Sequence, residues 1–274
     1  MTKRQLFIID PQNDFCDLPS TYLGSGQAPA LPVKGAHQDM LRLAGFLMQQ
    51  PDYFAKISVT LDSHQQWDIA HNVYWLDQQG QTVTPFTQIS LSEVMEGRYR
   101  CAQSAQQAQA LSYLRELEAQ HKHRLIAWPV HCELGSWGHA IHADLLQALH
   151  AWELSQHASV SKILKGLNPG TEHYSALRAE VPLSDDEGTQ VNQAILASLA
   201  DADEIWVAGQ AASHCVAATV IDLLQYLPVT PQRSWVLLQD CMSPVSGFED
   251  LAQSFFTQAE LAGVSLKKLA SNTL

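Results

Sequence analysis

A chain of 274 residues, of which 46% are hydrophobic and 16% charged, has the composition of a globular protein large enough to bury a substantial core. Its formal net charge of −12 is spread along the sequence, which argues against a phosphate-binding face, so we expect no nucleic-acid partner. Without a signal-peptide core or a stretch as long as a membrane span, we expect a cytoplasmic protein with no membrane contact.

Short β-rich runs alternate with amphipathic helical patterns along the chain. The expected strands are Leu6–Ile9, Tyr53–Leu61, Leu125–Val130, Val160–Leu164, Ile205–Ala208 and Trp235–Leu238. The expected helices are Ala36–Met48, Gln106–Ala119, Asn192–Ala200, Val216–Tyr226 and Phe248–Ala262. This alternation predicts an α/β fold with a mostly parallel central sheet and helices on both faces, in a three-layer arrangement of Rossmann type.

One domain over residues 1–274 is expected, with an insertion at about residues 75–124 that interrupts the alternation. The start of this insertion favours a hairpin around Gly80. Whether the insertion covers a site or builds an oligomer contact stays open.

Open α/β sheets bind ligands at the carboxyl ends of their strands, so chemistry is expected at that edge. The residues that follow the expected strands are Asp10, then Asp62 with His64, then His131, Lys165 and Cys215. An acid, a base, a thiol and imidazoles therefore fall at one edge of the sheet.

Cys215 is the candidate nucleophile. The five cysteines are widely spaced and form no Cys-x-x-Cys pair, so each thiol is either buried and inert or reactive in a special setting. Cys215 follows a strand-to-helix turn of small residues, Gly209–His214, which places it in the first turn of a helix. The free N–H groups and the helix dipole there stabilise both a thiolate and an oxyanion. The same turn would also suit simple close packing.

Lys165 and Asp10 each have a functional and a structural interpretation. Lys165 ends a buried strand, where it is either a cation that lowers the pKa of a neighbouring thiol or a side chain that reaches out to solvent. Asp10 follows the first strand, where it either shuttles protons for the thiol or forms a turn.

Asp62 and His64 have the spacing of metal ligands, because residues two apart in an extended chain point to the same face. His71 follows seven residues after His64, and His131 comes from another segment at the same edge. One carboxylate and up to three imidazoles suit a divalent Zn, Fe or Mn ion. The alternative is that these are ordinary histidines, since the chain has twelve and most histidines are exposed or hydrogen-bonded.

Five motifs together resemble the nicotinamidases of the isochorismatase-like cysteine hydrolase family. They are Leu6–Phe15, Asp62-Ser63-His64 with His71, Trp128–Cys132, Lys165-Gly166 with Tyr174–Leu177, and Gly209–Val216. The likeness runs in the family's order from residue 5 to about residue 240, interrupted by the insertion.

The resemblance implies a function for each motif. Asp10, Lys165 and Cys215 would be catalytic, and the N–H groups of Ala211 and Cys215 would form an oxyanion hole, with a cis peptide before Ala211. Asp62, His64, His71 and His131 would bind the metal, which orients the substrate. Phe15 and Trp128 would stack on the ring of a small amide substrate, which the resemblance implies is nicotinamide, deamidated through a cysteine thioester.

The sequence leaves two alternative functions open. A related cysteine amidase acting on another small amide, ureido or carbamoyl compound would share the catalytic residues, but metal-free relatives would not need the Asp62, His64 and His131 set. A non-catalytic metal- or ligand-binding protein could keep the fold, but it would not need Asp10, Lys165 and Cys215 together. The resemblance implies that oligomers are common among such hydrolases, so a homo-oligomer is possible and the oligomeric state stays open.

Overall fold

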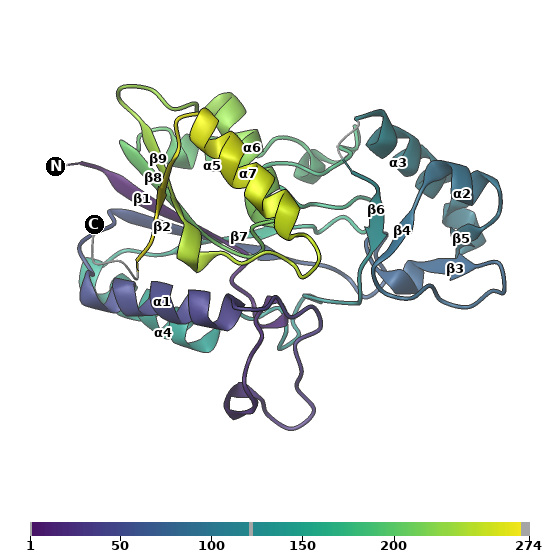
Figure 1. The fold of residues 1–274 in the computed structure, drawn as a ribbon, viewed down its shortest axis with the longest axis horizontal. Coiled ribbons are helices and arrows are strands. Elements are labelled where there is room, and N and C mark those ends of the chain that lie inside the picture. The colour runs from purple at the N-terminus through teal and green to yellow at the C-terminus, as the bar shows by residue number, and fades with distance from the viewer. Residues whose placement is uncertain (1, 121–122, 270–274) are drawn as a thin grey trace.

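The computed structural model describes residues 2–120 and 123–269 and has a six-stranded sheet at its centre (Figure 1). The strands follow the order β10-β9-β8-β1-β2-β7, and every neighbouring pair is parallel. They span β1 (Arg4–Ile9), β2 (Lys56–Asp62), β7 (Ser161–Lys165), β8 (Glu204–Gly209), β9 (Ser234–Leu238) and β10 (Ser265–Lys267). The inner strands are almost wholly buried, because helices cover both faces of a parallel sheet.

Helices α1 (Ala36–Gln49) and α4 (Ala143–Gln156) pack together on one face of the sheet (Figure 1). Helices α5 (Gln193–Leu199), α6 (Cys215–Tyr226) and α7 (Glu249–Leu261) cover the other face. Short 3₁₀ turns lie at Asn13–Phe15, Ser20–Tyr22, Asn72–Tyr74, Ser104–Gln106, Glu187–Thr189 and Gln239–Cys241. The expected three-layer α/β fold with a parallel sheet is thus confirmed.

The third expected strand does not join this sheet. The run Leu125–Val130 shortens to β6 (Leu125–Ala127), which pairs antiparallel with β4 (Thr87–Ile89). The prediction that it is a strand of the central parallel sheet was therefore wrong. Its continuation still reaches that edge, because bridges join Trp128 to His71 and Glu133 to His64.

Helix α4 was not predicted, although its sequence carries the helical signal. Its buried residues Leu145, Ala148, Leu149 and Trp152 follow the i, i+3, i+4, i+7 spacing of one helix face. The short edge strand β10 was also not predicted.

Residues 75–119, which make up most of the expected insertion, form a lobe at one end of the molecule (Figure 1). It contains β3 (Trp75–Asp77) paired antiparallel with β5 (Tyr99–Cys101), strand β4, α2 (Leu91–Met95) and α3 (Gln107–Ala119). A second apolar cluster, separate from the main core, holds the lobe together around residues such as Trp75, Ile89 and Leu114. The chain does turn back at Gly80, whose N–H donates to the Asp77 carbonyl.

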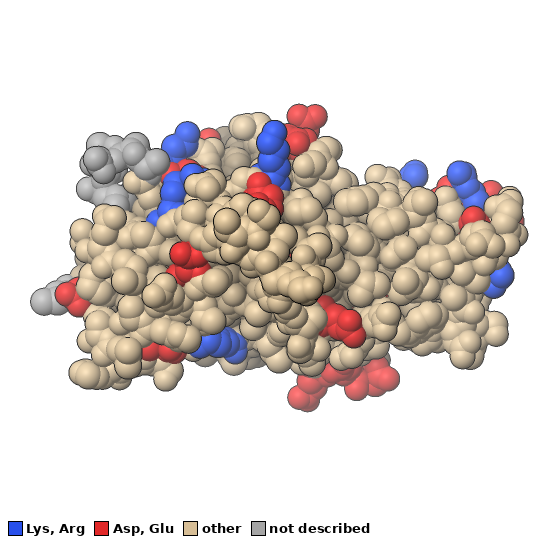
Figure 2. All heavy atoms as spheres, turned by 90° about the horizontal axis from the view of Figure 1, so that it is seen from below, with Lys and Arg blue, Asp and Glu red and all other residues tan. Residues whose placement is uncertain are grey.

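The face seen in Figure 2 carries Lys and Arg as separate spots and not as one continuous basic patch. This distribution matches the low and scattered positive charge of the sequence. Among the described residues, none of the helices is both long and apolar enough to span a membrane.

Candidate active site

The register of the central sheet brings the expected catalytic residues together. In the β2–β7 pair, Asp62 lies opposite Lys165, and in the β1–β8 pair, Ile9 lies opposite Gly209. Asp10 therefore emerges between the ends of β2 and β8, and Cys215 begins helix α6 after the turn that follows β8.

Asp10, Lys165 and Cys215 form one buried cluster, with 0%, 3% and 6% of each residue exposed. The Lys165 ammonium lies 3.0 Å from Asp10 Oδ2 and 3.6 Å from Cys215 Sγ. Oxygens of Asp10 and Asp62 and the sulfur of Cys215 all lie within 4.8 Å of one another. A proton could therefore pass between the thiol and the Asp10 carboxylate without any large movement of the chain.

Lys165 is held by three acceptors besides the thiol. It donates to Asp62 Oδ1 at 2.8 Å and to the His173 carbonyl at 2.7 Å, in addition to its ion pair with Asp10. Two carboxylates thus share one buried cation. This arrangement is not that of a lysine reaching out to solvent, which was the structural alternative.

The backbone at Asp10 is fixed in an uncommon conformation. Its φ of 45° lies in the left-handed region, which aspartate tolerates better than most residues. Thr60 on β2 holds it there: the hydroxyl donates to Asp10 Oδ1 at 2.6 Å and accepts the Asp10 N–H at 3.1 Å. One carboxylate oxygen is therefore anchored, while the other faces Lys165.

The turn before Cys215 leaves two N–H groups free. The Gln210–Ala211 peptide is cis, as the resemblance implied. In the described chain, neither the Ala211 N–H nor the Cys215 N–H donates to another protein group, whereas the Ala212 N–H donates to the Ser243 carbonyl. Unsatisfied N–H groups at the start of a helix can bind a developing negative charge.

The same turn requires glycine at position 209. Its φ is 123°, and a Cβ there would overlap the carbonyl of Ile9 on the neighbouring strand. The side chain of Gln210 also fixes the turn. Its Nε2 donates to Asp39 Oδ2 of α1 at 3.0 Å, and its Oε1 accepts the Ser243 N–H. These contacts keep the position of Cys215 fixed relative to the sheet.

The buried setting determines the charge states at rest. Burial raises the pKa of the Cys215 thiol well above its usual range, and Lys165 only partly offsets this effect. Lys165 thus lowers the pKa of the thiol, as expected, but by less than burial raises it. Burial also raises the pKa of Asp10 despite the neighbouring lysine, which makes this carboxylate a better proton acceptor.

Three imidazoles gather beside this cluster. Ligand atoms of His64, His71 and His131 lie within 4.8 Å of one another, and all three residues are buried. Asp62 Oδ2 lies 3.2 Å from His64 Nε2 and 3.6 Å from His131 Nε2. The four residues expected to bind a metal are thus brought to one place.

Nδ1 of each of the three imidazole rings already has a hydrogen-bonding partner. Nδ1 of His64 contacts Asp68 Oδ2 at 3.0 Å, Nδ1 of His131 contacts the Pro129 carbonyl at 2.9 Å, and Nδ1 of His71 contacts the Gln66 carbonyl at 3.3 Å. Such partners fix the tautomer that leaves Nε2 available to a metal. The chemistry and spacing of the donor set therefore fit a divalent cation.

Nε2 of His71, the nitrogen that would bind the metal, also takes part in a backbone hydrogen bond. It accepts the His131 N–H at 3.4 Å, a long bond that metal binding would replace. Burial, together with the neighbouring His131 and His64, lowers the pKa of His71 to about 3, so this ring is neutral and able to coordinate.

Asp62 joins the two clusters. One of its oxygens accepts from Lys165 and the other faces the histidines. Burial alone would raise the pKa of Asp62, but His64 and Lys165 hold it well below its usual range. Asp62 is therefore ionised, as both a metal ligand and a partner of lysine must be.

The two aromatic residues expected to stack on a substrate are both buried and contact different neighbours. Phe15 packs edge-on against the His131 ring, with 5.5 Å between centroids. Trp128 contacts the rings of His214 and Phe86, and its indole N–H donates to the Tyr174 hydroxyl at 2.9 Å. Their stacking role stays a prediction.

No protein-family model and no curated protein matches the sequence. The structure matches a nicotinamidase and pyrazinamidase from Acinetobacter (17% identity, 98% of both chains covered, TM-score 0.64). It also matches the yeast nicotinamidase (18% identity, 96% of this chain and 98% of that one, TM-score 0.62) and the Pyrococcus horikoshii pyrazinamidase in complex with zinc (17%, 97% and 99%, TM-score 0.56).

This is the isochorismatase-like fold. Two proteins named as isochorismatase-family or isochorismatase-like match with TM-scores of 0.53 and 0.52. At these identities the likeness concerns the fold alone.

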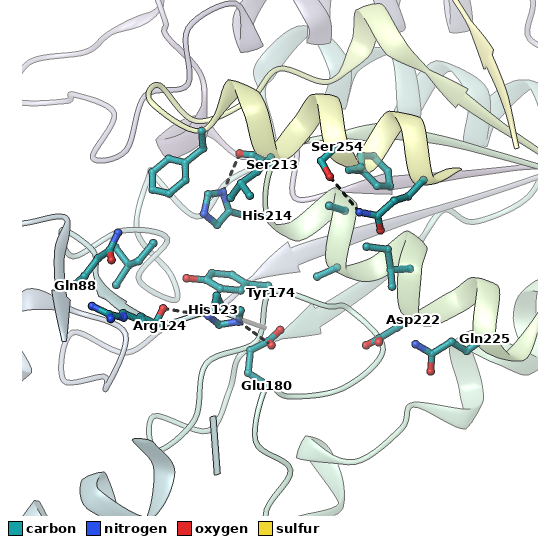
Figure 3. Close-up of a pocket in the computed structure, with 18 residues that line it drawn as sticks. Gln88, His123, Arg124, Tyr174, Glu180, Ser213, His214, Asp222, Gln225 and Ser254 are labelled. Carbon is teal, nitrogen blue, oxygen red and sulfur yellow. Dashed lines mark hydrogen bonds and ion pairs between the residues drawn. The ribbon is translucent and has the colours of Figure 1, made fainter. Parts of the chain in front are cut away.

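A pocket of about 660 Å³ is lined by Tyr174, His214 and residues around them (Figure 3). Residues of α6, α7, β4 and β6 line it, together with His123 and Arg124 before β6 and with Tyr174 and Glu180 in the loop after β7. Of the described catalytic and metal-site residues, none lines this pocket. It is therefore separate from the site described above, although His214 precedes Cys215 directly.

Sequence reasoning missed three buried residues at the site. Thr60 anchors Asp10, Asp68 holds His64, and Glu172 lies 4.0 Å from His64 Nε2. Thr60 was detectable, because it lies two residues before Asp62 on the same strand and so shares its face. Nothing in the local pattern marks Asp68 or Glu172, which reach the site through loops.

Proposed function

We propose that this protein is a hydrolase of the isochorismatase-like cysteine hydrolase family that cleaves a small carboxamide, with nicotinamide as the favoured substrate. The observation that carries the proposal is the buried contact of Lys165 with both Asp10 and Cys215, at the start of a helix with two free N–H groups. A purely structural cluster would not need an acid, a base and a thiol at hydrogen-bonding distances.

The proposed reaction begins with transfer of the Cys215 proton to Asp10 as the sulfur attacks the amide carbon. Lys165 balances the charge that develops, and the N–H groups of Ala211 and Cys215 stabilise the oxyanion. Asp10 then gives the proton to the departing amine, so ammonia leaves and a thioester remains. Asp10 next takes a proton from water, whose oxygen attacks the thioester carbon. The C–S bond then breaks to release the carboxylic acid, and Asp10 returns the proton to the Cys215 sulfur.

A divalent cation held by Asp62, His64, His71 and His131 would supply a Lewis-acid contact for a nitrogen of the substrate ring, directly or through water. Zinc is the proposed ion, since the Pyrococcus horikoshii neighbour is described as a zinc complex. Asp62 also touches Lys165, so the metal site and the catalytic cluster would influence each other.

The four candidate metal ligands favour nicotinamide over amides without a ring nitrogen, because the ring nitrogen can bind the metal. Phe15 and Trp128 would contact the two sides of the pyridine ring. Solved neighbours bind related compounds: the yeast nicotinamidase is described with the inhibitor nicotinaldehyde and the Leishmania infantum protein with nicotinate.

A different small amide is the second candidate. Phe86, from the insertion, packs edge-on against Trp128 with 5.6 Å between centroids and has a positive φ of 70°. A bulky residue in this conformation marks a constrained position, and it lies against a proposed substrate-stacking residue. The insertion could thus alter which amide the site accepts.

Ammonia release from nicotinamide tests the proposed function. We expect the metal-loaded protein to release ammonia and nicotinate, and a strong chelator to lower the rate by about 10-fold or more, with recovery when Zn²⁺ or Mn²⁺ is restored. A chelator-treated protein supplied with Mg²⁺ is the control, because Mg²⁺ disfavours imidazole ligands. Absence of ammonia release from the metal-loaded protein would contradict nicotinamide as the substrate.

A further inference from the structure

We infer that Phe86 is a positioning residue for the substrate: the lobe holds its ring against Trp128 and so fixes the indole on which a flat ring amide stacks. The inference rests on the proposed function, because it takes Trp128 as a substrate-stacking residue. It gives the lobe a part in substrate binding, which the sequence left open.

The pairing of two strands places Phe86 opposite Trp128. Strand β4 pairs antiparallel with β6, and Thr87 lies opposite Ala127 in their register (Figure 1). One residue beyond this pair, Phe86 therefore lies opposite Trp128, and its N–H donates to the Ala127 carbonyl at 2.7 Å. The two rings meet edge-on, with 5.6 Å between centroids and 80° between planes. Aromatic pairs in this arrangement restrict the orientation of both rings.

The other contacts of Trp128 come from the side of the active site. Its indole N–H donates to the Tyr174 hydroxyl at 2.9 Å. Its backbone N–H donates to the Ala70 carbonyl at 2.8 Å, and its carbonyl accepts the Asn72 N–H at 2.7 Å. The segment that carries the metal-ligand candidates thus holds one edge of Trp128, and Phe86 is the contact that the lobe adds.

The backbone at Phe86 has a conformation that phenylalanine adopts rarely. Phe86 follows Pro85 in a turn over residues 84–87, in which the Thr87 N–H donates to the Thr84 carbonyl at 3.2 Å. Its φ of 70° is typical of the third residue of a type II turn, where glycine or asparagine is preferred. A bulky aromatic residue is strained there, so the turn does not explain the ring.

Burial does not explain the ring of Phe86 either. Phe86 is 49% exposed, whereas Trp128 is 2% exposed. Within the described part of the chain, Phe86 belongs to neither the main apolar core nor the apolar cluster of the lobe. Its ring therefore contributes little to folding, and its recorded ring contact is the one with Trp128.

Uncommon backbone conformations gather around the active site. In residues 2–120 and 123–269, four non-glycine residues have a positive φ. Asp10 belongs to the catalytic cluster, Cys132 follows the metal-ligand candidate His131, and Phe86 contacts Trp128. The fourth, His157, ends helix α4. Strain of this kind persists where the surrounding structure and function require it.

The test compares nicotinamide hydrolysis by the metal-loaded wild type, Phe86→Asn and Phe86→Tyr. Asparagine suits the turn but removes the ring, so KM should rise by about 3- to 10-fold while kcat stays within about twofold. Tyrosine keeps the ring, so its KM should stay within about twofold of the wild type. Met95→Gln changes another exposed apolar residue of the lobe and is the matched control, with KM also within about twofold.

Thermal unfolding separates this role from a purely structural one. Asparagine relieves the strain of the turn, so the melting temperature of Phe86→Asn should equal or exceed that of the wild type although KM rises. A KM within twofold of the wild type would overturn the inference. So would a rise in KM that comes with a lower melting temperature, or an equal rise in Phe86→Tyr.

Calorimetric binding of nicotinamide to Cys215→Ala, with and without Phe86→Asn, distinguishes this inference from the proposed function. We expect Phe86→Asn to raise the dissociation constant by about 3- to 10-fold. If this rise is seen but the wild type releases no ammonia, the proposed hydrolysis is refuted and the role of Phe86 stands. If the wild type hydrolyses nicotinamide and the two constants agree, only the role of Phe86 is refuted. Absence of binding to Cys215→Ala would also overturn the inference, and ammonia release would then decide the proposed function alone.

Discussion

Replacing Cys215 by alanine is expected to lower the turnover of nicotinamide by at least about 10⁴-fold, because the sulfur forms the covalent bond on which both halves of the proposed reaction depend. The fold should persist, since alanine is small and fits a position at the start of α6. Steady-state ammonia release, with circular dichroism to confirm folding, measures the effect.

Cys241→Ala is the matched control for this substitution. Cys241 is also fully buried, but it lies after β9 and outside the catalytic cluster. Its loss should change stability modestly through packing and leave turnover within about twofold. Comparable turnover by Cys215→Ala and the wild type would rule out the cysteine mechanism.

Replacing Lys165 by methionine is expected to lower turnover by about 10³-fold and to destabilise the fold by about 3–5 kcal/mol, because it removes the cation that Asp10 and Asp62 share. Without Lys165, the pKa of Asp10 should rise further, since the lysine lowers it. A carboxyl group whose pKa is higher in the folded state contributes stability at low pH and loses it as pH rises. The loss of stability should therefore be larger at pH 8 than at pH 5 in urea unfolding.

Two further variants show whether the stability lost in Lys165→Met comes from the missing charge. Lys162→Met changes an exposed lysine on the same strand, paired with Glu153 at 3.6 Å, and should cost less than about 1 kcal/mol. Combining Lys165→Met with Asp10→Asn removes one of the uncompensated carboxylates and should recover part of the stability but none of the activity. Equal destabilisation by the single and double variants would contradict the proposed charge balance.

The sequence predicted that Asp10, Asp62, Lys165 and Cys215 gather at one edge of the sheet, because strand ends determine their positions. Asp10, Asp62 and Lys165 follow buried strands whose hydrophobic runs are plain, and parallel strands bring their carboxyl ends to one edge. Cys215 follows from the glycine-containing turn before an amphipathic helix. In these positions, local pattern and long-range geometry lead to the same conclusion.

The prediction failed where pairing depends on tertiary contacts. Leu125–Val130 has the apolar character of a buried strand, yet β6 pairs with β4 of the insertion, because periodicity does not say which partner a strand takes. The helix Ala143–Gln156 was missed even though one of its faces is regularly apolar.

The charge states at the site, and the side-chain contacts that support its residues, could not be predicted from the sequence either. The high pKa of the Cys215 thiol comes from complete burial, which a turn motif does not report. Thr60, Asp68 and Glu172 act at the site through side-chain contacts whose distances are fixed only by the folded chain.

Partitioning of the proposed thioester is the most direct test of the central claim that Cys215 carries the acyl group. Nicotinamide would be hydrolysed in the presence of increasing hydroxylamine, a nucleophile that competes with water for a thioester but not for a stable amide. We predict that nicotinohydroxamate replaces nicotinate while ammonia release does not slow, and that Cys215→Ala forms neither product. Ammonia and nicotinate formed without any hydroxamate, at every hydroxylamine concentration, would contradict a cysteine thioester intermediate.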